Sequence, residues 1–404
     1  MSFRPRKPSA SSTTGAREPQ VVPRRLFMAP DWQWSGAMRH IQHDRGWSPP
    51  HCPNPNCNFH NDFDEPWRFI RRGYYVRASD GLRVPRAECG TCGVTFSRQT
   101  FSTDYWLKRR DVPRRLFMRL VGGMCARQIA RDIGCSPETV NRQIARLGRH
   151  CMLFHMEMWK GAPPEGPIVV DGFESFEYSQ YHPIHHHLAV EADTGFWLYH
   201  TDSELRRKGR MTKYQRRRRA ELEEKHGRPD PQAIRKDMQE LLEVSLQNTD
   251  RAHVHSDDHR SYPPAIRDVE CTIRHTITSS KERRTTRNPL FPVNELDLLI
   301  RHSQANHKRE TIAFSKRRQG SAERLAILQV WKNYVKWWRE KRPGQTAAMR
   351  KGLTDRRISV AEILRERLFR TRIELPPRWA EYYDRLVWTR EILENRGHTL
   401  SYAY

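Results

Sequence analysis

Two pairs of cysteines are the first residues whose spacing indicates a chemical role. Four residues separate Cys52 from Cys57, and two separate Cys89 from Cys92. Four thiolates in two closely spaced pairs are the ligand set of a tetrahedral zinc site. A domain this small buries little apolar surface, so bound zinc would supply much of its folding free energy. The pattern predicts a structural zinc ribbon at residues 45–105, with no open coordination position for catalysis.

A second set of candidates consists of acids that follow short apolar runs. The run Ile168–Val170 leads into Asp171, and Ala252–Ser256 leads into Asp257. Carboxylates at strand ends, joined by a polar residue of a later helix, can hold two Mg²⁺ ions for phosphodiester cleavage and transfer. The later helix pattern offers the further candidates Asn294, Glu295, Asp297 and Arg301.

These acids require a sheet to position them. After a Pro- and Gly-rich linker, alternating or apolar segments predict strands at four places, namely 168–171, a hairpin at 187–199, 252–256 and 271–277. The stretch from Leu205 to Leu246 has a helical pattern and contains four consecutive arginines, Arg216, Arg217, Arg218 and Arg219. We interpret it as a basic arm that tracks DNA phosphates beside the active site; a solvated surface helix is the alternative.

Residues 126–147 contain two short helical patterns separated by a turn. Gly134 suits the left-handed end of the first helix, and Ser136 followed by Pro137 suits the start of the second. These features predict a helix-turn-helix, with a plain helical hairpin as the alternative. The residues expected to contact DNA lie on the second helix, and they are Ser136, Thr139, Asn141, Arg142 and Arg146.

The composition favours an anionic partner. The 404 residues include 72 Lys and Arg against 47 Asp and Glu, a formal net charge of +25. The mean hydropathy is −0.87, and no apolar run reaches the roughly 18 residues that a membrane span needs, so we exclude a membrane protein. Four of the eight cysteines stand alone, which argues against a secreted disulfide scaffold. Nucleic acid is the polyanion that such a surplus fits best.

The order of these features resembles the bacterial insertion-sequence DDE transposases, in which a zinc ribbon and a helix-turn-helix precede an RNase H-like catalytic domain. Three motifs carry the resemblance, and they are Val170-Asp171-Gly-Phe-Glu-Ser175, Ser256-Asp257-Asp-His-Arg-Ser-Tyr262 and Arg309-Glu-Thr-Ile-Ala-Phe-Ser315. The resemblance implies Zn²⁺ as a structural ion and Mg²⁺, replaceable by Mn²⁺, as the catalytic one. It also implies double-stranded DNA partners, both terminal inverted repeats and target DNA, a homo-oligomer, and a bacterial cytoplasmic, nucleoid-associated location.

The chain departs from the family at the third catalytic position. The register of the last motif puts Asn294 there, seven residues before Arg301, where the family has an acid. Seven residues return to nearly the same helix face, whereas Glu295 lies about 100° away. Asp297, three residues on, shares the face of Asn294 and could supply the missing carboxylate. An amide oxygen brings no negative charge and should hold a cation more weakly than a carboxylate does. The register nevertheless favours an Asp-Asp-Asn site, and Glu295 and Asp297 remain the alternatives.

The predicted fold is multidomain: a zinc ribbon, an all-α helix-turn-helix, and an α/β RNase H-like catalytic domain with a helical basic insertion and a helical C-terminal region. The expected ranges are 1–44 (a disordered basic arm and linker), 45–105, 106–160, 165–340 with the insertion at about 201–248, and 341–404. The expected function is a transposase that cleaves and transfers DNA strands. The alternatives are a DNA-binding regulator with an inactive catalytic domain, and a nuclease or resolvase without strand transfer.

Overall fold

A computed structural model describes residues 20–22, 46–61, 65–341 and 344–392. The chain forms two compact units, Met1–Phe101 and Ser102–Tyr404. The second unit contains the ranges predicted for the helix-turn-helix, the catalytic domain and the C-terminal region. The predicted basic arm at 1–44 lies outside the described residues except for 20–22. No helix in the described part of the chain is long and apolar enough to cross a membrane.

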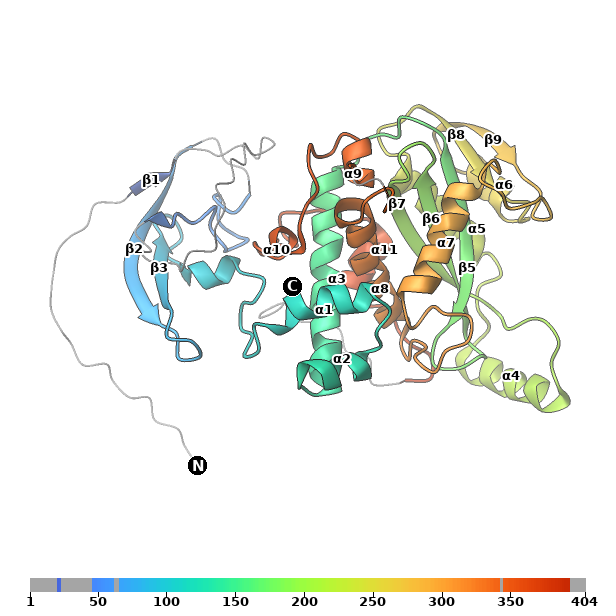
Figure 1. Cartoon of the computed structure of the whole chain (residues 1–404), viewed down its shortest axis with the longest axis horizontal. Coiled ribbons are helices and arrows are strands. Elements are labelled where there is room, and N and C mark those ends of the chain that lie inside the picture. Colours follow the sequence, from blue (N-terminus) through green and yellow to red (C-terminus); the bar gives the residue numbers. More distant parts are fainter. Residues whose placement is uncertain (1–19, 23–45, 62–64, 342–343, 393–404) are drawn as a thin grey trace. The chain divides into compact units, whose positions relative to one another are not determined.

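The first unit is built on a four-stranded antiparallel sheet in the order β1-β2-β3-β4 (Figure 1). The strands are β1 (Gln20–Val22), β2 (Trp67–Val76), β3 (Arg83–Cys89) and β4 (Thr95–Ser97), followed by a 3-10 helix, η2 (Arg98–Phe101). Aromatic rings make its small core: Trp67 and Phe96 stack with centroids 6.1 Å apart, and Phe101 packs edge-on against Phe96. The core therefore adjoins the cysteine pairs, because β3 ends at Cys89.

The second unit begins with α1 (Val112–Val121), α2 (Ala126–Ile133) and α3 (Pro137–Trp159). The turn between α2 and α3 follows the local sequence: Gly134 adopts φ 75° and ψ 54°, and the Ser136 hydroxyl accepts a hydrogen bond from the Thr139 N–H. The structure extends α3 to Trp159, well past the predicted end near Leu147. The reason is tertiary, since the second half of α3 is buried along α8 (Arg318–Val330), where a Cβ at Gly148 would come within 2.7 Å of the Glu323 backbone.

A five-stranded mixed sheet in the order β7-β6-β5-β8-β9 forms the centre of this unit. Its strands are β5 (Ile168–Phe176), β6 (Pro183–Glu191), β7 (Trp197–Glu204), β8 (Arg251–Ser256) and β9 (Thr272–Ile277). Strands β5, β6 and β7 pair antiparallel, whereas β8 pairs parallel to both β5 and β9. All the predicted strands are present, and the chain is a mixed α/β protein.

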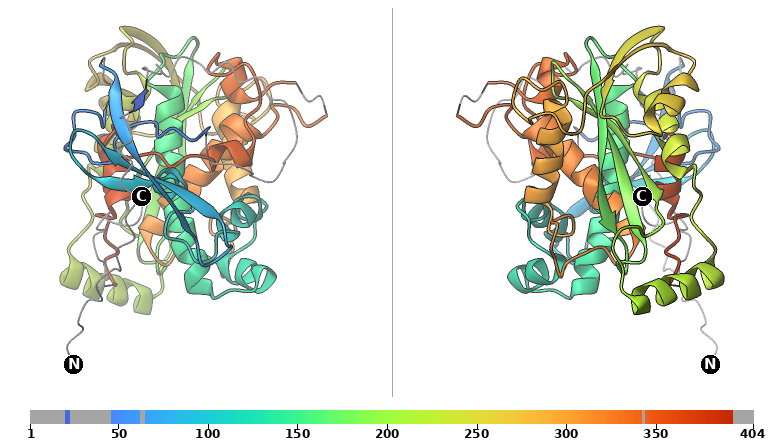
Figure 2. Two further views of the ribbon diagram at one scale, coloured as in Figure 1. Left: turned by 90° about the vertical axis from the view of Figure 1, so that its left-hand side faces the viewer. Right: turned by 90° about the vertical axis from the view of Figure 1, so that its right-hand side faces the viewer.

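Helices cover both faces of this sheet. Figure 2 shows α5 (Ala233–Ser245) and α6 (Tyr262–Arg267) on one side and α7 (Phe291–Ser303) on the other. The range 201–248, predicted as an insertion, divides in the structure: its start completes β7, and α5 packs on the sheet through the buried Met238 and Leu241. The part that projects is α4 (Lys213–His226), which extends past the end of the sheet (Figure 1).

The C-terminal region is less helical than predicted. Its described part contains only the short helices α9 (Ala347–Arg350), α10 (Val360–Ile363) and α11 (Pro377–Asp384) after the π-helix η3 (Trp331–Val335). Helix α10 ends after one turn, at Ile363. Side chains from distant parts of the chain replace the backbone N–H groups that would continue the helix there. His150 Nε2 lies 2.7 Å from the Ile363 carbonyl, and the Thr103 hydroxyl donates to the Leu364 carbonyl at 2.5 Å.

A buried ion pair joins β7 to α8. The Arg318 guanidinium donates from Nη2 to Asp202 Oδ1 at 2.9 Å and reaches Glu204 at 3.3 Å. Burial opposes ionisation of Asp202, but Arg318 holds the pKa of that carboxyl well below its usual range. Removing one partner leaves an uncompensated buried charge. The pair therefore fixes how α8 lies on the sheet.

Replacing Arg318 with methionine should lower the free energy of unfolding by about 3–5 kcal/mol, because Asp202 would stay buried without its cation. Urea unfolding followed by circular dichroism measures the change. The exposed neighbour Lys316 provides the control, since Lys316→Met should change stability by less than about 0.5 kcal/mol. The double change Arg318→Met with Asp202→Asn should recover part of the loss. Equal stability of the Arg318→Met variant and the wild type would contradict the prediction.

Lowering the pH from 7.5 to 5.5 should destabilise this unit, because histidines are buried in it as neutral rings. Burial lowers the pKa of His155 and His186 to about 4 and that of His200 to about 3. The unfolded chain takes up protons below about pH 6.5 while the folded chain does not, so this stability is complete above that pH and is lost as the pH falls. Each ring should cost about 1 kcal/mol at pH 5.5. Thermal unfolding across this range measures the slope, which His200→Gln should flatten and the exposed His302→Gln should leave unchanged.

Candidate functional site

The four predicted zinc ligands meet at one point of the first unit. The sulfurs of Cys52 and Cys92 lie 3.6 Å apart, and those of Cys57 and Cys89 lie 3.8 Å apart. All four sulfurs lie within 4.8 Å of one another. A tetrahedral zinc site with Zn–S bonds of about 2.3 Å places its sulfurs about 3.8 Å apart. These four cysteines could therefore hold a metal ion such as zinc.

Hydrogen bonds favour the thiolate at Cys89. Burial acts to raise its pKa, but the backbone N–H of Cys92 and the indole N–H of Trp67 outweigh burial and bring the pKa to about 7. The Trp67 Nε1 lies 3.4 Å from the sulfur. At Cys52, by contrast, burial raises the thiol pKa. Without a cation the buried cluster resists full ionisation, which is the state that a bound metal would stabilise.

The sheet places the two predicted acids on adjacent parallel strands. In the β5–β8 ladder Ile168 pairs with Val254 and Val169 with His255. Continuing this register by two residues puts Asp171 opposite Asp257, just past the last residue of β8. Neighbouring strands lie about 4.8 Å apart, so the two carboxylates are neighbours, with Asp171 inside β5 and Asp257 directly after the end of β8.

Burial and several neighbouring charges change the pKa of the Asp171 carboxyl. Burial is the largest cause that raises its pKa to about 7, and the charges of Asp257 and Asp297 raise it further. The Gly172 N–H donates to Asp171 Oδ1 at 2.7 Å, and Arg284 also lowers the pKa. All three like charges thus belong to residues that were candidates from the sequence, and a cation would relieve their repulsion.

Residues of the second motif fix the position of the Asp257 side chain. The His259 N–H donates to Asp257 Oδ1 at 3.0 Å, which fixes the turn after β8. Tyr262 is buried, and its hydroxyl lies 3.4 Å from His185 Nε2 on the neighbouring strand β6. The next residue, Asp258, has its pKa lowered by hydrogen bonds from Ser280, so it anchors the following loop instead of entering the site.

Helix α7 presents one polar face to Asp171. The Arg301 Nε donates to both carboxylate oxygens of Asp297 at 3.1 and 3.2 Å. The Arg301 guanidinium also lies over the ring of Phe173, 5.2 Å from its centroid, and Phe173 is two residues after Asp171 on the same face of β5. Arg301 therefore holds Asp297 close to Asp171.

The three candidates for the third position face different surroundings. Asn294 is half-buried one turn before Asp297, on the same face of α7. Glu295 is exposed and interacts electrostatically with Lys332 of η3, a buried ammonium whose pKa burial lowers to about 7. The structure thus separates Glu295 from the face that carries Asn294 and Asp297. The sequence alone did not show that the charge of Asp297 acts on the Asp171 carboxyl.

The third motif lies in the loop between α7 and α8 and packs against the end of β5. Ser315 accepts from Asn306 Nδ2 at 3.0 Å through its hydroxyl and from the Tyr178 N–H at 2.9 Å through its carbonyl. Phe314 packs on Phe176 with centroids 5.2 Å apart. These contacts are structural, and the motif places α7 relative to the strand that carries Asp171.

The residues predicted to contact DNA from α3 divide into two groups. Ser136, Asn141 and Arg142 are exposed, and Thr139 is half-buried at the same end of the helix. Arg146 does not fit the prediction, since its side chain is only 8% exposed and donates to the Tyr105 carbonyl. The reason is that the buried second half of α3 begins at Ile144 and therefore includes Arg146.

The arginine run of α4 is partly neutralised within the helix. Arg217 and Arg218 both lie near Glu221, at 3.5 and 3.1 Å, and Arg219 lies 3.4 Å from Glu223. Arg216, Arg217 and Arg218 are nevertheless exposed. The helix offers a cationic surface, with six Lys and Arg against three Glu between Lys213 and His226.

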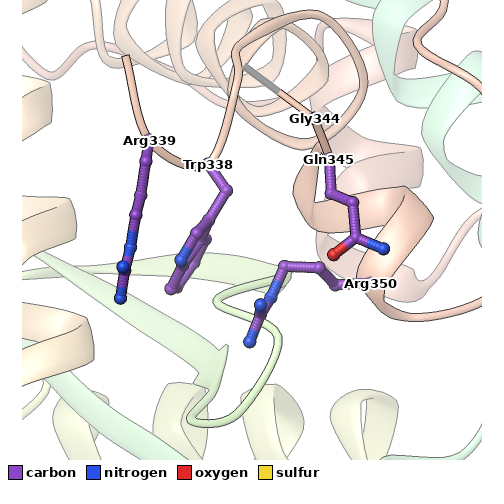
Figure 3. Close-up of a pocket in the computed structure, with 5 residues that line it drawn as sticks. All are labelled: Trp338, Arg339, Gly344, Gln345 and Arg350. Carbon is purple, nitrogen blue, oxygen red and sulfur yellow. The ribbon is translucent and has the colours of Figure 1, made fainter. Parts of the chain in front are cut away.

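A cavity of about 340 Å³ lies near the turn between β6 and β7, and it was not predicted. Figure 3 shows Trp338, Arg339, Gln345 and Arg350 around it. Trp338 lies beyond the end of η3, and Arg350 sits over its ring at 4.5 Å from the centroid. The same ring covers Gly195, where a Cβ would come within 2.0 Å of it. No local spacing pattern indicates these contacts, because Gly195 and Trp338 are far apart in the chain.

Neither a protein-family model nor a curated protein matches the chain. Among solved structures, the chain is similar to one chain of the "CryoEM structure of simian T-cell lymphotropic virus intasome in complex with PP2A regulatory subunit B56 gamma". The match has 13% identity, a TM-score of 0.23, and covers 46% of this chain and 53% of that chain, about half its length. A likeness this slight supports no conclusion about fold or function.

Proposed function

We propose that this protein is a Mg²⁺-dependent transposase that cleaves and transfers DNA strands. The observation that carries the proposal is the register of β5 and β8, which puts Asp171 opposite Asp257 beneath the polar face of α7. The mixed sheet with three antiparallel strands followed by two parallel ones is compatible with the RNase H-like domain that the sequence motifs imply. The excess of 25 positive charges suits a DNA substrate.

The residues at this site fit a divalent cation. Carboxylate and amide oxygens are the ligands that Mg²⁺ prefers, and Asp171, Asp257, Asn294 and Asp297 supply them. Among the described residues only the four cysteines bring three or more ligand atoms all within 4.8 Å, so the acids are more widely spread. When bound, two Mg²⁺ ions would activate the attacking oxygen and stabilise the leaving one.

The chain's own residues position the reactants. Asp171 and Asp257 mark the point where the scissile phosphate must lie, and Arg301 holds Asp297 there. Arg284, whose charge reaches Asp171, is placed to attract the phosphate backbone. Water would attack the phosphodiester at the element end, breaking the bond to the 3′-oxygen. The freed 3′-hydroxyl would then attack a phosphodiester of the target DNA, forming a bond to that phosphorus while the bond to the target's own 3′-oxygen breaks and leaves a target 3′-hydroxyl.

DNA binding is assigned to surfaces outside this site. The exposed start of α3, with Ser136, Asn141 and Arg142, would enter a major groove at the terminal inverted repeats. The zinc unit and the exposed arginines of α4 would add phosphate contacts. A homo-oligomer is expected because transposition joins two DNA ends.

Variants of α7 test the assignment of the third position. Asn294→Ala and Asp297→Asn should each lower the cleavage rate by about tenfold or more and raise the Mg²⁺ concentration needed for half-maximal rate. Glu295→Ala is the matched control and should stay within about twofold, since its side chain faces Lys332. Asn294→Asp should lower the Mg²⁺ requirement, because it adds a charged ligand. Loss of activity in Glu295→Ala alone would reject this face of α7.

A DNA-binding regulator with an inactive catalytic domain is the second candidate, favoured by the amide at Asn294. An assay on DNA that carries the flanking repeats, scoring joined products separately from nicked ones, distinguishes the candidates. A transposase yields both products. Zinc-dependent binding without cleavage indicates the regulator, and nicking without joining indicates a nuclease or resolvase.

A further inference from the structure

Strands β2 and β3 continue as a two-stranded ribbon beyond the sheet of the zinc unit. Strand β1 pairs only with Trp67–Phe69, and β4 pairs only with Arg86–Glu88. The pairs Tyr74 to Pro85 and Val76 to Arg83 therefore lie outside the four-stranded part. A bulge between Arg71 and Tyr74, with Gly73 at φ 70°, marks the point where the ribbon begins.

One face of this ribbon is apolar, aromatic and exposed. Tyr74 is 50% exposed and Val76 is 60% exposed. Because they are two residues apart on one strand, and Arg83 pairs opposite Val76, the three side chains share one face. The Arg83 guanidinium lies over the Tyr74 ring, 3.5 Å from its centroid. Tyr75 lies on the other face, where its hydroxyl donates to Gln99 at 2.8 Å.

The charge of the ribbon indicates which kind of partner binds this face. Between residues 71 and 88 there are five arginines and two acids; Asp80 pairs with Arg77 and Glu88 with Arg72, which leaves a surplus of three arginines. An exposed strand with apolar side chains is a liability unless a partner covers it. The surrounding arginines favour a polyanion over a protein surface, and a two-stranded ribbon has the width that a DNA major groove admits.

We infer that the β2–β3 ribbon is a second DNA-reading element, which enters a major groove with the face made by Tyr74, Val76 and Arg83. The stacked guanidinium would reach guanine N7 and O6 or a phosphate, while Tyr74 and Val76 would contact thymine methyl groups and sugars. The inference rests on the proposed DNA-processing function and extends it, because it assigns part of the recognition to the zinc unit independently of α3.

Binding of the zinc-loaded full chain to a mixed-sequence 30-base-pair duplex, without added Mg²⁺, tests this inference. Fluorescence anisotropy should show about tenfold weaker binding for the double variant Tyr74→Ala, Arg83→Ala, and a salt dependence reduced by about one ion. Tyr75→Phe changes the opposite face, and Trp388→Ala removes a ring that is 49% exposed elsewhere; both should bind as the wild type does. Zinc content and circular dichroism confirm that the variants fold.

Dimethyl sulfate reports on the groove, because it methylates guanine N7 there. The wild type should protect guanines that the double variant leaves reactive. Unchanged affinity and protection in the double variant would overturn the inference, as would tighter binding to the 30-nucleotide single strand than to the duplex. Ribbon-dependent binding without any cleavage in Mg²⁺ or Mn²⁺ would leave this inference standing while the proposed catalysis fails. Cleavage together with unaltered DNA binding in the double variant would contradict this inference and leave the proposed catalysis standing.

Discussion

Replacing Asp257 with asparagine should lower the rate of DNA strand cleavage by about 10³-fold or more, because the site loses one of its two facing carboxylates. Asp171→Asn should have an effect of similar size. The adjacent Asp258 provides a matched control: its carboxylate is held by Ser280, so Asp258→Asn should retain activity within a few fold. A cleavage assay with Mg²⁺ or Mn²⁺ on DNA with the flanking repeats measures all three.

Thermal unfolding separates this catalytic effect from misfolding. Asp171 is half-buried and is repelled by Asp257 and Asp297, so Asp171→Asn should unfold at the same temperature as the wild type or higher. A site shaped for a cation carries such repulsion at the expense of stability. Cleavage that survives both substitutions at the wild-type rate would refute the assignment of this edge of the sheet.

Removing zinc should unfold the first unit and leave the second folded. Four sulfurs within 4.8 Å of one another, three of them in buried cysteines, repel one another as thiolates without a cation, and structural zinc typically contributes on the order of 10–16 kcal/mol. The indole of Trp67, which is buried and donates to Cys89, reports on this change. Its fluorescence should shift to the red on chelation, while the thermal transition of the second unit persists.

Substitutions of cysteine give the matched test. Cys89→Ser should abolish binding of one zinc ion per chain and expose the first unit to limited proteolysis. Cys271→Ser changes an isolated, half-buried cysteine of the second unit and should preserve both the zinc content and the protease resistance. Protease resistance of the first unit in the Cys89→Ser variant would show that its aromatic core folds without the ion.

Features that depend on a few neighbouring residues were predictable. The cysteine spacing indicated four sulfurs that the structure brings together. Gly134, Ser136 and Pro137 indicated the turn between α2 and α3, because caps act within one helical turn. The apolar runs before Asp171 and Asp257 indicated the strands that carry them, but only β8 ends at its acid; β5 continues past Asp171 to Phe176 because it stays paired with β6.

Features that depend on distant contacts were decided by the tertiary structure. Whether Glu295 or Asp297 approaches Asp171 depends on the rotation of α7 about its axis, which the packing on β5 and the contact of Arg301 with Phe173 fix. Arg146 is buried because α3 continues along α8. The early end of α10 follows from donors, His150 and Thr103, more than 200 residues away. Periodicity and capping therefore determined which elements form and which residues they carry, whereas the free energy of long-range burial determined which of those residues face one another.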